Sequence, residues 1–555
     1  MIYSNKKLSQ LIVASCVAYQ VEHVIISPGS RNAPLIIGFA NHPKIKAYSV
    51  VDERSAAFFA LGIAQQTQKP TAIICTSGSA LLNYYPAIAE AYYSNIPLVV
   101  ISADRPKHLI DIGDGQTIRQ EGVFKNHSLY NANLIEGIAS FQENSVQITK
   151  ALHASISEKG PVHINVPFDE PLYETVANKS IETPLALQVE SNATVVDYSK
   201  FVSLWGTSKK KLILIGANYP DKELEQLLSK IIEDESVLVF TETISNVHHP
   251  KFINSIDKLI FLLDDNSLEE LQPNILITLG GMVVSKKIKQ FLRAYQPEQH
   301  WHIDTKKADN TYHCLTEHVK VDSVVFFDTI LKQHKKIASS YQKNWLTVKS
   351  DRDKKHQKFI DDAAFSDLKV FDIILKHIPK QAQLQLSNSS IIRYTQLFDV
   401  NKSVQVFCNR GTSGIDGSTS TAIGASQVAQ QQTVFITGDI SFFYDSNALW
   451  NAYLKKDFKI ILVNNGGGNI FKFIPGPSTT NALEFFETPH HLSAKQLCEM
   501  YHIEYVLVET EDALKNKLQV FFNVNNSAKL LEVNTSEMNN DTILRSYFKS
   551  LSIDS

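Results

Sequence analysis

From Val21 onward, short apolar runs alternate with segments of helical periodicity, and a turn rich in Gly, Ser or Pro follows each run. In the first part of the chain these units read VEHVIISPGSRN, KAYSVVDERSAAFFALG, TAIICTSGSALLN and PLVVISADRP. Short apolar runs bounded by turn residues are typical of buried strands. The alternation therefore predicts parallel βα units, in which helices connect the strands of one sheet.

Two later blocks repeat this pattern. The second block has strand-like runs at KLILIGAN, SVLVFTET, KLIFLL and NILITLGG, and the third has them at SVQVFCNRG, TVFITGDIS and KIILVNNGGG. Residues 182–200 show neither period and are predicted to be a linker. The charged run 343–362 is predicted to be an exposed connecting helix. We therefore predict an α/β fold of three doubly wound parallel-sheet domains, at residues 1–183, 184–345 and 346–555.

Composition excludes several classes of protein. With 555 residues and 44% hydrophobic content, the chain is long enough to bury several cores. The 54 Lys and Arg nearly balance the 57 Asp and Glu, so no general attraction to nucleic acid or to anionic membranes is expected. No apolar stretch reaches the roughly 18 residues of a membrane span. The five cysteines lack CxxC spacing, which argues against a zinc cluster or a disulfide framework and favours the cytoplasm.

The strongest chemical motif lies in the third block. One apolar run ends in Gly438-Asp439 and the next ends in NNGGG, with 26 positions from Asp439 to Asn465. Ligands bind at the carboxyl ends of parallel strands, and carboxylate, amide and backbone oxygens suit Mg²⁺. Gly-Asp and Asn-Gly are ordinary turn formers when they stand alone. Joined at this spacing after two apolar runs, they match the thiamine diphosphate signature.

Other phosphate-binding motifs do not fit the sequence. There is no GxxxxGK[ST] loop, and Gly411, Gly414 and Gly417 have the wrong spacing for GxGxxG. A P-loop and an ordinary dinucleotide-binding domain therefore lose their support.

Glu53 stands at a junction between a predicted strand and an apolar helix. Thiamine chemistry requires a carboxylic acid hydrogen-bonded to the pyrimidine ring, so that the cofactor can lose its C2 proton, and a partly buried carboxyl group with a raised pKa suits that task. An acid that merely favours the helix dipole is the alternative interpretation. The metal motif elsewhere in the chain favours catalysis.

Histidines are assigned no catalytic role. Pairs such as His248-His249 and His490-His491 lack a carboxylate or Cys partner at ligand spacing, so they are expected in exposed loops.

Several motifs together resemble one family. SPGSRNAPL at residues 27–35, DERSAAFFALG, ISADRP, the Gln116 loop and NRGTSGIDG are similar to the 2-succinyl-5-enolpyruvyl-6-hydroxy-3-cyclohexene-1-carboxylate synthases, from residue 8 to about residue 475. The resemblance implies a transferase of menaquinone biosynthesis that decarboxylates 2-oxoglutarate and adds the succinyl carbanion to isochorismate. It also implies thiamine diphosphate, Mg²⁺ (or Mn²⁺), and a homodimer or homotetramer in which the first domain of one subunit binds the pyrimidine and the third domain of another binds the diphosphate.

The resemblance also assigns residues by position. Glu53, Arg31 and Gln116 would act at the reacting centre, and the metal ligands would be Asp439, Asn465 and the Gly467 carbonyl. Further cofactor contacts would come from Ser77, Gly78, Ile415, Gly438, Ile440, Ser441, Ile470 and Phe471. Substrate contacts would come from Ser30, Arg31, Arg105, Gln116, Lys286, Lys287, Ser389, Arg393, Arg410, Phe471 and Ile474. The family commonly has Lys-Arg where this chain has Lys286-Lys287, and Lys lacks the bidentate fork of Arg.

Two rival functions remain open on the sequence. The metal motif and Glu53 also fit an acetolactate synthase or another 2-oxo acid decarboxylase, although the set of arginines favours doubly anionic substrates. A catalytically silent thiamine-fold binding protein is the alternative from another class.

Overall fold

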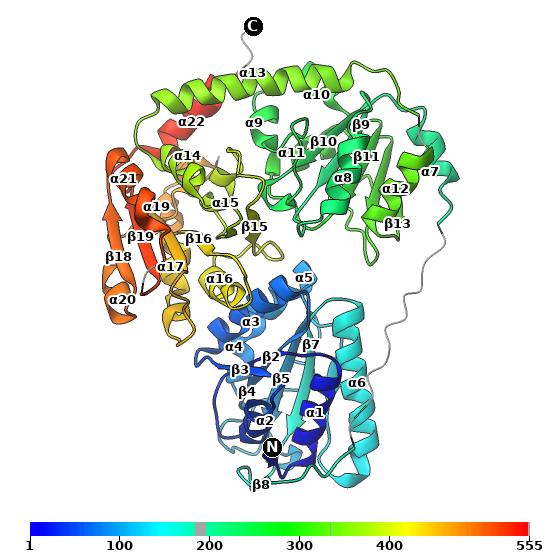
Figure 1. The fold of residues 1–555 in the computed structure, drawn as a ribbon, viewed down its shortest axis with the longest axis vertical. Helices are drawn as coiled ribbons and strands as arrows, with labels where there is room; N and C mark the ends of the chain where they lie inside the picture. Colours follow the sequence, from blue (N-terminus) through cyan, green and yellow to red (C-terminus); the bar gives the residue numbers. More distant parts are fainter. Residues whose placement is uncertain (183, 185–195, 334, 475, 525, 553–555) are drawn as a thin grey trace.

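The computed structural model describes residues 1–182, 184, 196–333, 335–474, 476–524 and 526–552. Three parallel sheets with flanking helices follow one another along the chain (Figure 1), which confirms the predicted α/β class. Most of the predicted linker, and the predicted boundary at 183/184, fall in or beside the stretch outside the described residues. Among the described residues, no helix combines the length and apolar character that a membrane crossing requires.

The first domain is built on a six-stranded sheet in the order β3-β2-β4-β5-β7-β6. Its central strands are buried along their whole length because helices cover both faces of the sheet. The strands are β2 (His23–Ile26), β3 (Lys46–Ser49), β4 (Thr71–Cys75), β5 (Leu98–Asp104), β6 (Asn131–Asn133) and β7 (Val162–Pro167), with the separate pair β1 (Tyr3–Ser4) and β8 (Thr175–Val176). The helices are α1 (Lys7–Ala18), α2 (Ala33–Ala40), α3 (Glu53–Thr67), α4 (Ala80–Asn83), α5 (Tyr85–Ser94), η1 (Lys107–Leu109), η2 (Ile138–Ser140) and α6 (Phe141–Ser157).

The second domain has a five-stranded sheet in the order β10-β9-β11-β12-β13. Its strands are β9 (Lys211–Ile215), β10 (Val237–Thr241), β11 (Ile275–Leu279), β12 (Gln299–Ile303) and β13 (Glu317–Val319). Its helices are α7 (Ser199–Trp205), α8 (Lys222–Ile231), η3 (Thr243–Ser245), α9 (Ile256–Ile260), α10 (Asp265–Leu271), α11 (Lys286–Ala294) and α12 (Ser323–Gln333). The strand predicted at KLIFLL was wrong, because α9 covers the start of this run. A short buried apolar run has the same composition in a helix as in a strand.

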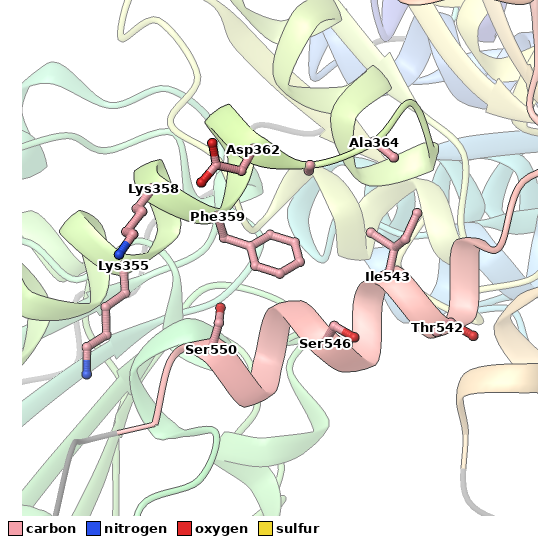
Figure 2. Close-up of a pocket in the computed structure, with 10 residues that line it drawn as sticks. Lys355, Lys358, Phe359, Asp362, Ala364, Thr542, Ile543, Ser546 and Ser550 are labelled. Atoms are coloured by element: carbon pink, nitrogen blue, oxygen red, sulfur yellow. The ribbon is translucent and has the colours of Figure 1, made fainter.

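The long helix α13 (Tyr341–Asp362) connects the second domain to the third (Figure 1). It is a helix as predicted, but one face is buried, including Trp345 and Arg352, so only its other face is exposed. The boundary predicted at 345/346 falls inside this helix. A groove of about 520 Å³ runs between α13 and α22 (Asn540–Ser550), and no predicted site residue lines it (Figure 2).

The third domain has a six-stranded sheet in the order β15-β14-β16-β17-β19-β18. Its strands are β14 (Gln383–Leu386), β15 (Gln405–Cys408), β16 (Thr433–Gly438), β17 (Lys459–Asn464), β18 (Glu504–Val508) and β19 (Lys529–Asn534). Besides α22, its helices are α14 (Asp367–His377), α15 (Ser390–Thr395), α16 (Ser418–Ser426), α17 (Asp439–Tyr444), η4 (Ser446–Leu449), α18 (Ile470–Phe473), η5 (Pro477–Thr479), α19 (Leu483–Glu487), α20 (Lys495–Met500) and α21 (Glu511–Phe521).

Helices α3 and α16 pack closely and join the first domain to the third. Two glycines permit this approach. A Cβ atom on Gly62 would lie 2.0 Å from the Thr421 carbonyl oxygen, and one on Gly424 would lie 2.0 Å from the Phe59 carbonyl oxygen. Both obstacles are backbone atoms, so no side-chain rotation relieves them.

We expect Gly424→Ala to destabilise the protein. The added methyl group improves helix propensity by up to about 1 kcal/mol, but overpacking against fixed backbone costs about 1–3 kcal/mol. The net loss is measurable as a lower midpoint of chemical denaturation. Gly115→Ala is the control, because its Cβ would meet no atom within 4 Å. Equal midpoints for the two variants would contradict the close packing of α3 on α16.

Candidate active site

The predicted metal and cofactor residues of the third domain follow four adjacent strands. Strands β15, β14, β16 and β17 are parallel neighbours, so their carboxyl ends meet at one edge of the sheet. A cavity of about 260 Å³ opens at this edge. Among the predicted residues, its lining includes Ser389, Ile415, Gly438, Asp439, Ile440, Ser441, Asn465, Gly467 and Phe471.

Asp439 is the first residue of α17 and is buried. Its Oδ1 accepts a hydrogen bond from the Ile440 amide at 2.7 Å, and its Oδ2 accepts one from the Gly467 amide at 2.9 Å. The second bond joins the end of β16 to the loop after β17. The carboxylate is therefore held in one orientation at the cavity.

Asn465 presents a buried oxygen to this region. Its Nδ2 donates to Oδ2 of Asp367 at 2.8 Å, whereas its Oδ1 is buried and accepts no hydrogen bond from the described residues. A buried amide oxygen without a donor is costly, and a hard cation satisfies it. The donor set of Asp439, Asn465 and the backbone of Gly467 thus fits Mg²⁺. No cluster of three or more His, Cys, Asp or Glu in the described chain offers an alternative metal site.

The loop after β15 carries the predicted residues Arg410 and Ile415. Arg410 Nη1 donates to Asn388 Oδ1 at 2.7 Å, and Asn388 Nδ2 donates to the Gly414 carbonyl at 2.7 Å. The Ser441 hydroxyl donates to the Ile415 carbonyl, also at 2.7 Å. The loop is therefore fixed from two sides, with Ile415 at the cavity.

Cationic side chains gather beside the cavity. Burial lowers the pKa of Arg393, and the nearby Arg410 lowers it further, while Asp257 opposes the shift. Arg393 Nη1 donates to the Ser389 carbonyl at 2.8 Å. Ser389 lies immediately before α15 and not within it. Two guanidinium groups held this close favour an anionic partner.

The second domain adds a lysine that the sequence did not single out. Lys286 and Lys287 begin α11, and Lys287 Nζ lies 5.0 Å from the centre of the Phe261 ring. Lys289 is more buried. Its pKa is lowered by burial and by Arg410, with Glu242 opposing. In α11, Lys289 lies three positions after Lys286, on the same side of the helix, whereas Lys287 points in another direction.

The first domain forms a second group at the ends of β2, β4 and β5, which are neighbours in its sheet. Arg31 is buried and donates from Nη1 to the Phe168 carbonyl at 2.7 Å. Its pKa is lowered by burial and by Arg105. Arg105 Nη2 donates to the Gly115 carbonyl at 3.2 Å, next to the exposed Gln116. Exposed Ser30 precedes Arg31.

Ser77 and Gly78 adjoin this group. A Cβ atom on Gly78 would lie 3.3 Å from the Gln116 carbonyl oxygen, so the two loops touch. The Gly78 amide donates to Gln120 Oε1 at 2.9 Å. The Ser77 hydroxyl is buried and has no hydrogen-bond partner among the described residues. These loops bring together four predicted residues: Ser77, Gly78, Arg105 and Gln116.

Glu53 is the first residue of α3, and Asp52 caps that helix by accepting from the Ser55 amide at 3.1 Å. Burial raises the pKa of Glu53, and neighbouring Asp52 raises it further, while a backbone hydrogen bond opposes the shift. A carboxyl group with this tendency holds a proton more readily than an exposed glutamate.

Within one chain, direct polar contacts between the two groups are absent from the described residues. In the described parts of the molecule, no hydrogen bond or ion pair joins a predicted site residue of the first domain to one of the third. The hydrogen bonds that do link the domains are made by neighbouring residues. Glu90 of α5, for example, accepts from the Gly411 amide at 2.7 Å and from the Thr412 amide at 2.6 Å.

Two features of the site were absent from the sequence predictions. Glu90 lies in an alanine-rich helix without any motif, so nothing marked it as a support for the Arg410 loop. The exposed position expected for His490 was wrong. Its side chain is 13% exposed, and its Nε2 lies 3.3 Å from Asp439 Oδ2. The two residues are 51 positions apart (490 − 439), so only folding brings them together.

The apolar residues predicted to cover the cofactor lie around α18. Phe471 lines the main cavity, and Ile470 lines a smaller one of about 70 Å³ together with Arg393. Ile474 follows this helix and is partly buried. Helix α18 thus brings Phe471 to the cavity that holds the candidate metal ligands, whereas Ile470 faces the smaller cavity.

Comparisons with known proteins cover almost the whole chain. Residues 6–128 match the thiamine pyrophosphate enzyme N-terminal TPP binding domain, residues 194–386 the middle domain, and residues 389–533 the C-terminal TPP binding domain. A protein of Flavobacterium johnsoniae is 52% identical, covering 99% of this chain and 100% of its own length. One of Flavobacterium psychrophilum is 53% identical, with coverages of 99% and 100%. One of Porphyromonas gingivalis is 37% identical, with coverages of 100% and 98%. All three are named 2-succinyl-5-enolpyruvyl-6-hydroxy-3-cyclohexene-1-carboxylate synthase.

Proposed function

Because this chain belongs to the 2-succinyl-5-enolpyruvyl-6-hydroxy-3-cyclohexene-1-carboxylate synthase family of thiamine diphosphate-dependent enzymes, we propose that it decarboxylates 2-oxoglutarate and adds the resulting succinyl unit to isochorismate. The observation that carries the proposal is the third-domain sheet edge, where oxygen atoms suited to a metal ion lie next to the buried Arg410 and the half-buried Arg393. A decarboxylase that acts on monoanionic 2-oxo acids needs fewer arginines to bind the carboxylates of its substrate.

The metal ligands are Asp439, Asn465 and the carbonyl of Gly467, and the ion is Mg²⁺, with Mn²⁺ as a substitute. The unsatisfied Oδ1 of Asn465 supports this assignment. Thiamine diphosphate, when bound, supplies a carbon nucleophile for the keto acid and an electron sink for loss of CO₂. The Ile415 side chain at the cavity supports the cofactor, and Phe471 excludes water from it.

The substrate carboxylates are bound by arginines from both groups. Arg393 and Arg410 lie on the third-domain side, with Lys289 and the Lys286-Lys287 pair across from them. Arg31 and Arg105 lie on the first-domain side with Ser30 and Gln116. Planar guanidinium groups give bidentate bonds to carboxylates, and their mutual repulsion without substrate favours binding of a dianion. Glu53 holds a proton at the pyrimidine nitrogen of the cofactor.

Turnover measurements test the reaction. Purified protein is incubated with thiamine diphosphate, Mg²⁺ and 2-oxoglutarate, with and without isochorismate, while isochorismate loss and product mass are followed. Isochorismate-dependent formation of the succinylated adduct supports the proposal. Release of CO₂ without consumption of isochorismate would move the assignment to another thiamine-dependent decarboxylase, and inertness in both assays would indicate a silent binding protein.

The complete site forms between subunits of a homodimer or homotetramer, as the resemblance to the family implies. The five cysteines are all free thiols, which supports a cytoplasmic location.

Mixing two inactive variants tests the shared site. If Glu53 of one subunit faces Asp439 of another, a heterodimer of Glu53→Gln and Asp439→Asn contains one site with both substitutions and one with neither. Random pairing then restores about a quarter of the wild-type activity. Activity that stays at the level of the separate variants, although mass spectrometry shows mixed oligomers, would place the whole site within one chain.

A further inference from the structure

Asp367 lies behind the candidate metal ligand Asn465 and belongs to none of the predicted motifs. It is the first residue of α14, is 1% exposed, and lines the cavity at the third-domain sheet edge. Its Oδ2 accepts from Asn465 Nδ2 at 2.8 Å. An acid at the start of an apolar helix is usually explained by the helix dipole, which is why its sequence position attracts no notice.

Both carboxylate oxygens of Asp367 are occupied. While Oδ2 accepts from Asn465, Oδ1 accepts from the Thr535 hydroxyl at 2.6 Å. The Asp367 amide donates to Asn540 Oδ1 at 2.8 Å. Asp367 is therefore fixed on three sides, and each of its carboxylate oxygens already accepts a hydrogen bond from the protein.

The side-chain amide of Asn465 can face its surroundings in two ways, related by a half-turn. An ionised carboxylate only accepts hydrogen bonds, so Asp367 requires the Asn465 NH₂ group on its own side. The amide oxygen must then point away from Asp367, and it is this oxygen that is buried without a donor among the described residues. The reversed amide would set oxygen against carboxylate and present NH₂ to a cation, and both arrangements are repulsive.

We propose that Asp367 is a positioning residue that holds the Asn465 amide with its oxygen toward the metal ion. The inference rests on the metal site proposed above. It also gives a function to the C-terminal segment, because Thr535 and Asn540 hold Asp367 in place from beyond β19. Outer-shell partners of this kind fix the orientation of a ligand before the metal binds.

The test measures Mn²⁺ binding by electron paramagnetic resonance, in the presence of thiamine diphosphate and without substrate. We expect Asp367→Ala to weaken Mn²⁺ binding by roughly 10–100-fold, as removal of outer-shell partners does elsewhere. Asp372→Ala is the matched control, because Asp372 is a largely buried residue on the same helix whose partner is Lys376. A comparable loss in Asp372→Ala would attribute the effect to general damage to α14 and overturn the proposal.

A second comparison, made in the Asn465→Asp variant, separates the orienting effect of Asp367 from its other effects. In Asn465→Asp the ligand has two equivalent oxygens and needs no orienting partner. Adding Asp367→Ala to Asn465→Asp is therefore expected to leave Mn²⁺ binding unchanged or to strengthen it by removing a neighbouring negative charge. An equal loss in both backgrounds, or no loss in Asp367→Ala alone, would overturn the role of Asp367 and leave the metal site standing. Absence of Mn²⁺ binding in the wild-type protein would overturn both.

Discussion

Glu53→Gln is expected to lower kcat by roughly 10²–10⁴-fold, the usual range for loss of a group that transfers or holds a proton in the reaction. Glutamine keeps the size of the side chain but cannot hold the proton that the cofactor's pyrimidine nitrogen requires. The raised pKa of Glu53, caused mainly by burial, suits that duty because the carboxyl group holds a proton more readily than an exposed glutamate does. Steady-state turnover of isochorismate measures the loss.

The same variant must still bind its cofactor for this interpretation to hold. The metal ligands lie in the other group of residues, so binding of Mg²⁺ is expected to stay close to that of the wild-type protein. Glu22→Gln is a matched control, since Glu22 is an exposed acid of the same domain. Unchanged turnover in Glu53→Gln would remove Glu53 from the mechanism.

Asp439→Asn is expected to abolish cofactor loading at ordinary Mg²⁺ concentrations. Its carboxylate is the single formal negative charge in the proposed ligand set. It also accepts a hydrogen bond from the amide of Gly467, whose carbonyl is another proposed ligand. The loss in metal affinity should exceed the roughly 10–100-fold that accompanies loss of an outer-shell partner. Titration calorimetry with Mg²⁺ and thiamine diphosphate measures it directly.

Asp512→Asn provides the comparison for that experiment, because it makes the same chemical change on the exposed face of α21 in the same domain. High Mg²⁺ should partly restore turnover to Asp439→Asn if the defect lies in metal binding. If Asp439→Asn binds Mg²⁺ as tightly as Asp512→Asn does, the metal lies elsewhere.

Much of the site could be read from local sequence because its residues follow strand ends. In a parallel sheet, neighbouring strands end at one edge, so motifs such as Gly438-Asp439 and the NNGGG run converge without any knowledge of the loops. In the first domain, Arg31, Ser77 and Arg105 were assigned through the family resemblance, and they too follow strand ends. The strand prediction failed at KLIFLL, where an apolar run without periodicity formed part of a helix.

Sequence by itself determined the α/β class, the thiamine enzyme family and the order of the ligand-bearing loops, because periodicity and loop motifs are local properties of the chain. Only the tertiary structure decided which other side chains contact those loops and hold them in place. His490 beside Asp439, Glu90 behind the Arg410 loop and Asp367 behind Asn465 come from segments far apart in the chain. Their partners are chosen by the packing of helices and sheet edges, and packing depends on contacts that no local pattern encodes.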